Sequence, residues 1–453
     1  MKKYESYTIC PSLWNKEFPS HWCVLPMYAV AKEKSICNCV DLPLLSVYLD
    51  VGVVPFSAKA EKRTNVTSKD LSKYQRVDFG DFVLNNQQAW RGSVGISFDT
   101  GIVSPAYVVL SMNDYLDSRY ANYLFRSRIM VEQYLINSKS VGSIQRNIYW
   151  PALKRTKVLI PSRDEQDQIV RFLDWKVSSI NKLINIQKEQ IRVIEELKEK
   201  AVCEVLLHGI DVGVSYKDSG IEWIGSIPER WKVIKIKWLF DEVDERNTDQ
   251  TTELLTFSKK RGLLPFAEAS DKMPSASDLS NYKILHKGQL LENRMQAWHG
   301  MFICSDREGC VSPDYSIFSA SKEREVSVKF YEYVFRSHIW VEQFANASRG
   351  VGSGFNRLYT PQFGAIHTVY PAIDEQRRIV EYLDKKTARL NAVITQIERR
   401  IEGLEELKLT LIADTVTGKI DVRGIDVPEY EYVEETIDDN NEDCEEETEE
   451  QED

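Results

Sequence analysis

The sequence predicts an α+β protein in which one unit, a β-rich domain followed by a long helix, occurs twice and the two helices pair as an antiparallel coiled coil. Three observations carry this prediction: an internal repeat, a change within each copy from strand-like to helix-like sequence, and a heptad pattern along each helical part. At 453 residues the chain exceeds one ordinary domain, which agrees with such an organisation.

The repeat is visible without gaps over long stretches. The ten residues FRSRIMVEQY at 125–134 return as FRSHIWVEQF at 335–344. At the same offset, 18 of 51 positions are identical between 161–211 and 371–421. Shorter matches extend the duplication upstream with small slips in offset, among them QAW in both copies and the pair VSPAY and VSPDY. The duplication therefore predicts two copies of one structural unit, at 7–211 and 216–421.

Each copy has two parts. The first is rich in β-branched and aromatic residues broken by Gly, Pro and Asn, a pattern typical of short strands and loops. The second contains neither Pro nor Gly over more than 40 residues in the first copy, so it predicts one helix of roughly 65 Å. We expect a first β-rich domain, a central helix, a second domain with its lead-in segment, a C-terminal helix and a tail, at 1–160, 161–209, 210–370, 371–421 and 422–453.

A heptad pattern runs along both helical parts. Apolar residues recur every seven positions in the second copy and, more loosely, at the same positions of the first. A seam this long needs a partner helix, which the other copy supplies. The alternative is a helix packed on its own domain, but a helix of this length overruns a domain of this size. The expected seam consists of Leu173, Ile180, Ile194, Leu383, Leu390, Ile397, Leu404 and Leu411.

The net charge of −11 is distributed unevenly along the chain. Ile425–Asp453 carries 16 Asp and Glu and no Lys or Arg, which leaves 58 basic and 53 acidic residues elsewhere. A mildly basic body permits nucleic-acid binding without requiring it. The composition of the tail predicts disorder, with a solubilising role favoured over mimicry of DNA.

Several classes of protein are disfavoured. No signal peptide or stretch of 18 apolar residues is present, and the eight cysteines show no zinc-finger spacing. We expect a cytoplasmic protein without metal or cofactor. There is no Walker A motif, methyl-donor loop or N-P-P-Y-type tetrapeptide. Asp174-Trp175-Lys176 and its repeat at 384–386 fit half of a nuclease motif, but we interpret them as solvated or docking charges. The chain is therefore not expected to be an enzyme.

Two motifs carry a family resemblance. YKDSGIEWIGSIPERWKVIKIKWLF at 216–240 resembles the start of a target-recognition domain in the specificity subunits of type I restriction–modification systems. PAIDEQRRIVEYLDKKTARLNAVI at 371–394 is similar to the opening of their helical regions, and both motifs occur again, more loosely, in the first half. The resemblance implies that each β-rich domain is a target-recognition domain reading one half of a bipartite site in double-stranded DNA. It also implies a single copy that docks two methyltransferase subunits on its helices, with restriction and translocase subunits added for cleavage.

The side chains suited to reading base edges gather in matching segments of the two copies. Arg and Lys suit guanine, and Asn and Gln suit adenine. Residues identical in both copies, such as Asn85 with Asn293 and Trp90 with Trp298, are expected to support the loop or to contact the DNA backbone. The candidates in this first cluster are Asn86, Gln87, Gln88 and Arg91, and in the second copy Arg294, Gln296 and His299.

A second polar cluster follows in each copy, at 139–147 and 349–357. Serine hydroxyls and backbone amides there suit phosphate, and the flanking basic groups suit phosphate or base. The alternative is an ordinary polar surface loop. The candidates are Lys139, Ser143, Arg146 and Asn147 in the first copy, and Arg349, Ser353, Asn356 and Arg357 in the second.

Two other functions share parts of this evidence. A tandem coiled-coil adaptor for proteins would show the same heptads and acidic tail, but no salt-dependent affinity for DNA. A self-sufficient nuclease or methyltransferase would need the motifs that are missing.

Overall fold

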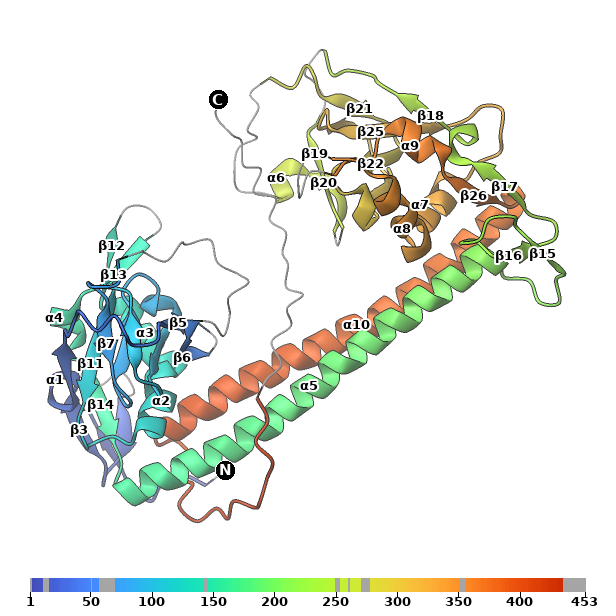
Figure 1. Ribbon diagram of the computed structural model, residues 1–453. Coiled ribbons are helices and arrows are strands. Elements are labelled where there is room, and N and C mark those ends of the chain that lie inside the picture. Colours follow the sequence, from blue (N-terminus) through green and yellow to red (C-terminus); the bar gives the residue numbers. More distant parts are fainter. Residues whose placement is uncertain are drawn as a thin grey trace. The chain divides into compact units, whose positions relative to one another are not determined.

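The computed structural model describes residues 2–10, 16–49, 51–56, 70–141, 145–248, 253–259, 261–269, 278–350 and 356–434. The chain divides into two compact units (Figure 1). Unit 1 comprises Met1–Lys188 with Glu398–Asp453, and unit 2 comprises Glu189–Ile397. Each unit therefore contains one β-rich domain with the adjoining ends of two long helices.

Unit 1 is built from short strands and four short helices ahead of the long helix α5. Its sheet of four strands has the order β4-β11-β8-β9, and smaller antiparallel pairs surround it. The strands are β1 Tyr7–Ile9, β2 Glu17–Pro19, β3 Cys23–Pro26, β4 Ala31–Lys34, β5 Leu45–Tyr48, β6 Gly52–Pro55, β7 Gln75–Val77, β8 Phe82–Asn85, β9 Val94–Ile96, β10 Gly101–Val103, β11 Tyr107–Met112, β12 Ser138–Val141, β13 Gln145–Ile148 and β14 Lys157–Ile160. The helices are α1 Met27–Val30, α2 Ser118–Arg126, α3 Arg128–Ile136, α4 Trp150–Leu153 and α5 Arg163–His208.

Unit 2 repeats the central sheet of unit 1. Its sheet has the order β18-β25-β22-β23, the counterpart of β4-β11-β8-β9. The strands are β15 Tyr216–Asp218, β16 Ser226–Pro228, β17 Lys232–Lys235, β18 Phe240–Val243, β19 Leu255–Ser258, β20 Gly262–Pro265, β21 Lys283–Leu285, β22 Leu290–Asn293, β23 Phe302–Cys304, β24 Gly309–Val311, β25 Tyr315–Ala320 and β26 His367–Tyr370. The helices are α6 Phe266–Ala269, α7 Val328–Arg336, α8 His338–Ala347, α9 Thr360–Ala365 and α10 Ile373–Val416.

Each of the two β-rich domains has its own apolar core. In unit 1, Phe82 of β8 stacks on Phe125 of α2 at 4.5 Å between ring centroids, and neither ring is exposed. In unit 2, Phe302 of β23 contacts Phe335 and Phe363 at 5.5 Å. The core of each domain also takes in the adjoining ends of the long helices. This packing fixes each domain on its own part of the helical pair.

The two long helices run in opposite directions. Both α5, with 46 residues, and α10, with 44, are continuous. In unit 1, Lys408 Nζ donates to Asn181 Oδ1 at 3.3 Å, and in unit 2 Lys198 Nζ donates to Asn391 Oδ1 at 3.0 Å. Later residues of α5 are thus paired with earlier residues of α10, so the helices are antiparallel. Figure 1 shows them side by side. The predicted α+β class, duplication and antiparallel helical pairing are confirmed.

The predicted seam residues are all at least partly shielded from solvent. Five of them are buried: Leu173, Ile180, Leu383, Ile397 and Leu411. The other three, Ile194, Leu390 and Leu404, are half-buried. Within the described residues, no helix is long and apolar enough to cross a membrane.

The repeated Glu-Gln pair at the start of each long helix has a structural role. In unit 1, Glu165 Oε1 accepts from Tyr4 Oη at 2.5 Å, and its Oε2 lies 2.9 Å from His21 Nε2. In unit 2, Glu375 accepts two hydrogen bonds from Arg230, at 2.6 and 2.9 Å. The adjacent Gln166 and Gln376 each accept from the backbone N–H that precedes α2 or α7, at 2.7 and 2.9 Å. These bonds give the repeated motif the same structural role in both units.

Of the two nuclease-like aspartates, expected to be solvated or docking charges, Asp384 is exposed and Asp174 is not solvated. Asp174 is only 5% exposed, and its carboxylate accepts from Tyr123 Oη at 2.9 Å and from Arg119 Nη2 at 2.6 Å. Asp384 accepts from Tyr333 Oη at 2.6 Å in unit 2. The aspartates therefore attach α2 and α7 to the long helices.

The N-terminal segment lies against the end of α10. The backbone N–H of Asp421 donates to Lys2 O at 2.9 Å, and Tyr7 Oη donates to Gly418 O at 3.0 Å. Composition predicted disorder for the whole tail from 422, but residues 422–434 are held on α5 because its side chains donate to their backbone carbonyls. The rest of the tail, 435–453, is outside the described residues.

Candidate nucleic-acid interface

The first predicted cluster forms a tight turn after a central strand in each domain. In unit 1, Asn85 Oδ1 accepts from the backbone N–H of Gln87 at 3.2 Å, and Trp90 Nε1 donates to Gln87 O at 2.9 Å. The turn closes with a short 3₁₀ segment, Ala89–Arg91, and with Gly92 at a φ of 110°. A positive φ of this size suits glycine, since other residues are strained there.

Unit 2 builds the same turn with the same scaffold residues. Asn293 Oδ1 accepts from the N–H of Met295 at 3.1 Å, and Trp298 Nε1 donates to Met295 O at 2.8 Å. Gly300 has a φ of 77°. The residues shared by the two copies therefore form the scaffold of the turn, and the residues that differ are presented by it.

The two predicted clusters meet within each domain. In unit 1, the N–H of Ile148, at the end of β13, donates to Asn86 Oδ1 at 3.0 Å and to Asn86 O at 3.2 Å. Arg146 lies over the Trp90 ring at 5.9 Å, and Arg91 lies over the same ring at 5.1 Å. The hairpin β12–β13 and the turn after β8 therefore form one surface.

Unit 2 joins its clusters by the equivalent backbone bond. The N–H of Leu358 donates to Arg294 O at 3.1 Å, and Arg349 and Arg357 exchange backbone hydrogen bonds at 2.9 and 3.0 Å. The His299 ring lies on Trp298 with centroids 3.6 Å apart. Within the described residues, this surface thus gathers Arg294, Arg349 and Arg357.

An aspartate that sequence reasoning missed lies among these arginines. Arg294 Nε donates to Asp314 O at 2.7 Å and its Nη2 donates to Pro313 O at 3.1 Å. The Asp314 Oδ1 lies 3.7 Å from Nη2 of both Arg294 and Arg357. The first copy has Ala106 at this position, so the mismatch between VSPAY and VSPDY was the available signal. The free chain thus keeps Arg294 close to its own backbone, half-buried.

The exposure of the remaining candidates differs. Gln87, Gln88, Arg91, His299, Arg349 and Asn356 are exposed, while Asn86, Gln296 and Arg357 are half-buried. Lys139 Nζ lies 3.5 Å from the centre of the Tyr149 ring, and Asn147 pairs with Lys139 in the β12–β13 hairpin. Ser143 and Ser353 lie outside the described residues. The structure thus brings the described candidates of each copy into two adjoining segments of their domain, where a flat polar ligand has access to the exposed ones.

No metal chemistry is indicated in the part of the chain that the structure describes. No group of three or more His, Cys, Asp and Glu side chains there is arranged to hold a metal ion.

Comparison with known proteins relates part of the chain to one family. Residues 32–196 match the family model of the type I restriction modification DNA specificity domain. This part of the chain therefore resembles the specificity domain of that family, and the match covers less than half of the chain. The matched residues include the turn after β8, the hairpin β12–β13 and the first part of α5.

A curated member of the specificity-subunit family resembles the chain in sequence. The specificity subunit of the type I restriction enzyme MjaVIII from Methanocaldococcus jannaschii is 29% identical over 177 residues, 38% of this chain and 39% of that protein. The chain thus matches about two fifths of the length of this curated relative.

Two solved structures are similar to the chain at low sequence identity. One, from work on complex assembly and conformational transition of the type I R-M system, has a TM-score of 0.61 at 14% identity, covering 89% of this chain and 99% of that chain. The HsdS subunit from Thermoanaerobacter tengcongensis aligns over 89% of this chain and 98% of its own, at 16% identity with a TM-score of 0.42. The first likeness supports the fold.

Proposed function

We propose that the chain is the non-catalytic DNA specificity subunit of a type I restriction–modification complex. Each domain reads one half of a bipartite site in double-stranded DNA, and the long helices dock two methyltransferase subunits. Restriction and translocase subunits complete the complex, which contains one copy of the chain. The expected recognition domains are 1–160 and 210–370, the helical segments are 161–209 and 371–421, and the tail is 422–453.

One observation carries the proposal. The two domains share the scaffold of a turn, Asn85 and Trp90 in one and Asn293 and Trp298 in the other, but present different side chains on it. An identical support with divergent polar contacts is what two readers of different sequences require, because base edges are distinguished by donor and acceptor patterns. The long helical pair supplies the surface proposed for methyltransferase docking, because it exposes apolar residues such as Leu183 and Leu407.

The proposal predicts a bipartite pattern of adenine methylation. Single-molecule mapping in cells that make this chain with its methyltransferase is expected to show a two-part motif with a fixed spacer, absent from cells without the chain. Exchange of the first domain for that of a relative is expected to change one half of the motif only. Identical maps with and without the chain would refute the proposal. Absence of a salt-dependent affinity for DNA in the assembled complex would then favour a protein adaptor.

Asp314→Asn is expected to steepen the salt dependence of DNA binding by the assembled complex. The substitution removes the negative charge between Arg294 and Arg357, so the logarithm of affinity is expected to fall more steeply with salt, by about one unit of slope. Asp306→Asn is the matched control, because its 71% exposed side chain pairs with Arg307 and the charge change is the same. Equal slopes for both variants would show that Asp314 is not at the DNA surface.

A further inference from the structure

The described end of the tail lies along one stripe of α5. Gln168 Nε2 donates to Val422 O at 3.0 Å and to Ile425 O at 2.7 Å. Farther along the helix, Ser178 Oγ donates to Glu431 O at 2.8 Å and accepts from the N–H of Val433 at 2.7 Å. Ser178, Asn181 and Asn185 are spaced by three and four residues and share a helix face, whereas Gln168 lies about 80° around the helix from Ser178. We name residues 425–434 the strap, and the four α5 side chains Gln168, Ser178, Asn181 and Asn185 the stripe.

Two asparagines complete the stripe. Asn181 Nδ2 donates to Val433 O at 3.1 Å, and Asn185 Nδ2 donates to Glu434 O at 2.9 Å. The segment from Gln168 to Asn185 rises about 26 Å along the helix, and an extended strap of about nine steps covers a similar distance. The strap therefore runs along the helix axis as an extended segment.

The contacts of the stripe are independent of the strap's sequence. All of these hydrogen bonds join a side chain of α5 to a main-chain N–H or C=O of the tail. Ser178 and Asn181 are buried beneath it, at 2% and 7% exposure. Any extended segment of suitable length presents the same main-chain groups. The stripe is thus a surface for an extended peptide, which the strap fills in this chain.

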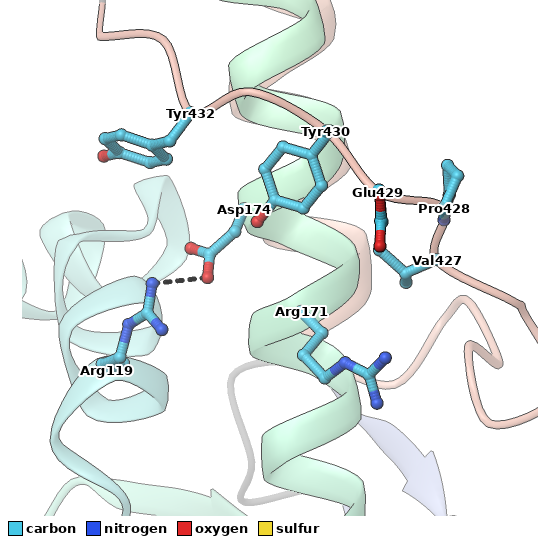
Figure 2. Close-up of a pocket in the computed structure, with 8 residues that line it drawn as sticks. All are labelled: Arg119, Arg171, Asp174, Val427, Pro428, Glu429, Tyr430 and Tyr432. Carbon is cyan, nitrogen blue, oxygen red and sulfur yellow. Dashed lines mark hydrogen bonds and ion pairs between the residues drawn. The ribbon is translucent and has the colours of Figure 1, made fainter.

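The fit of the strap is incomplete in its middle. Between its two anchored ends, an open pocket of about 680 Å³ is lined by Arg119, Arg171, Asp174 and residues 427–430 and 432. Figure 2 shows Tyr430 and Tyr432 above Asp174, while Arg119 reaches the aspartate from α2. Among the described residues, no carboxylate forms an ion pair with Arg171. Glu429 of the strap lines the same pocket without forming an ion pair with Arg171, so an extended segment that places a carboxylate against Arg171 gains an interaction that the strap lacks.

The second copy repeats one of these three anchors. The α10 positions equivalent to Ser178, Asn181 and Asn185 are Ala388, Asn391 and Thr395, and Asn391 Oδ1 accepts from Lys198 as Asn181 Oδ1 accepts from Lys408. The chain that follows α5 leads into the second domain. The strap therefore covers the α5 side chains in unit 1, and α10 lacks two of the three side chains that would anchor a second strap.

We propose that the stripe is a docking surface for an extended acidic segment of a methyltransferase subunit, and that the strap occupies it until that subunit displaces the strap. This inference rests on the proposed function. The strap is tethered next to its site at Val422, so it competes at a high effective concentration. The two methyltransferase subunits then bind with different affinities, and only the weaker one depends on the strap.

The test compares three chain lengths in a titration with the methyltransferase, followed by mass photometry. The full chain is expected to bind one subunit tightly and the second on the order of tenfold more weakly. A chain ending at Gly424 lacks the strap and is expected to bind the weaker subunit more tightly, so that the difference between the two affinities narrows. A chain ending at Glu434 lacks 12 of the acidic residues but keeps the strap, and is expected to match the full chain. Equal affinities for all three lengths, or weaker binding after loss of the strap, would overturn the inference.

Two further measurements separate this inference from the proposed function and from misfolding. A fluorescent peptide of residues 425–434 is expected to bind the chain ending at Gly424 and not the one ending at Glu434; failure to bind the former would overturn the inference. In the full chain, Val433→Pro removes the N–H that Ser178 accepts and is expected to narrow the difference between the two affinities. Absence of methyltransferase binding to every form would instead refute the proposed function, and with it the methyltransferase as the partner of the stripe.

Discussion

Replacing Glu292 by leucine is expected to remove a fall in the stability of unit 2 between about pH 5 and pH 9. Glu292 lies in β22 with no exposed surface, and within the described residues neither carboxylate oxygen has a hydrogen-bond partner. Burial raises the pKa of Glu292 to about 8, against the attraction of Arg294 and with a contribution from Glu242. Lys283, on β21, also favours the charged form.

The direction of the change in stability with pH depends on which state, folded or unfolded, binds the proton of Glu292. Between the unfolded pKa of about 4.3 and the folded pKa, the unfolded state releases a proton that the folded state keeps. Stability therefore falls as pH rises through this window, by on the order of a few kcal/mol above pH 8. The first copy already has leucine at this position, Leu84 of β8, which is fully buried. The substitution therefore places a side chain that this strand position accommodates.

Urea unfolding at pH 5, 7 and 9, followed by pulsed hydrogen exchange of β22 and β25, measures this effect. Strands β8 and β11 provide the reference from unit 1. Glu332→Leu is the matched control, because this buried carboxylate accepts from the N–H of Cys304 at 2.9 Å and pairs with Lys329 at 3.0 Å. That variant is expected to be less stable throughout the pH range. Equal pH dependence in the wild type and the Glu292→Leu variant would contradict the prediction.

Phe302→Ala is expected to cost about 3–5 kcal/mol of the stability of unit 2, the range for deletion of a buried aromatic side chain. Phe302 has no exposed surface and contacts Phe344 at 5.0 Å between ring centroids, in addition to Phe335 and Phe363. Removal of the ring leaves a cavity that rigid aromatic neighbours fill poorly. The core of unit 1 shares no residue with this cluster, so its unfolding midpoint is expected to stay unchanged.

The same urea experiment at pH 7 compares Phe302→Ala with Phe79→Ala. Phe79 is 65% exposed, and its removal is expected to cost less than about 1 kcal/mol. Equal losses for the two variants, or a shift of both units by Phe302→Ala, would show that the two cores are not energetically separate.

Much of the fold was predictable because the sequence contains two copies of one unit. The absence of Pro and Gly identified the first long helix, the repeat extended it to the second, and the heptads identified their pairing, since these signals are local or repeated. The two clusters of candidate residues were also found from composition and alignment of the copies. Their contact, through Ile148 and Asn86 in one domain and Leu358 and Arg294 in the other, needed the folded chain.

Other features depend on burial that no sequence pattern reports. A glutamate is expected on the exposed face of a strand, but Glu292 has no exposed surface in the central strand β22. Asp314 differs from its counterpart Ala106, yet its position between two arginines follows from the turn geometry. The acidic composition of the tail predicted disorder for the strap. Its contacts with α5 could not be predicted, because the side chains that anchor it lie some 250 residues earlier in the chain.

The contact between Lys2 and Asp421 has a topological consequence. In unit 2, a continuous peptide joins the end of α5 to the following β-rich domain, whereas in unit 1 the end of α10 meets its domain through noncovalent contacts alone. The linear order of the two copies is therefore a matter of covalent connectivity and not of packing. A permuted chain that closes this junction and opens the one after His208 is therefore expected to retain the same cores and helical pairing.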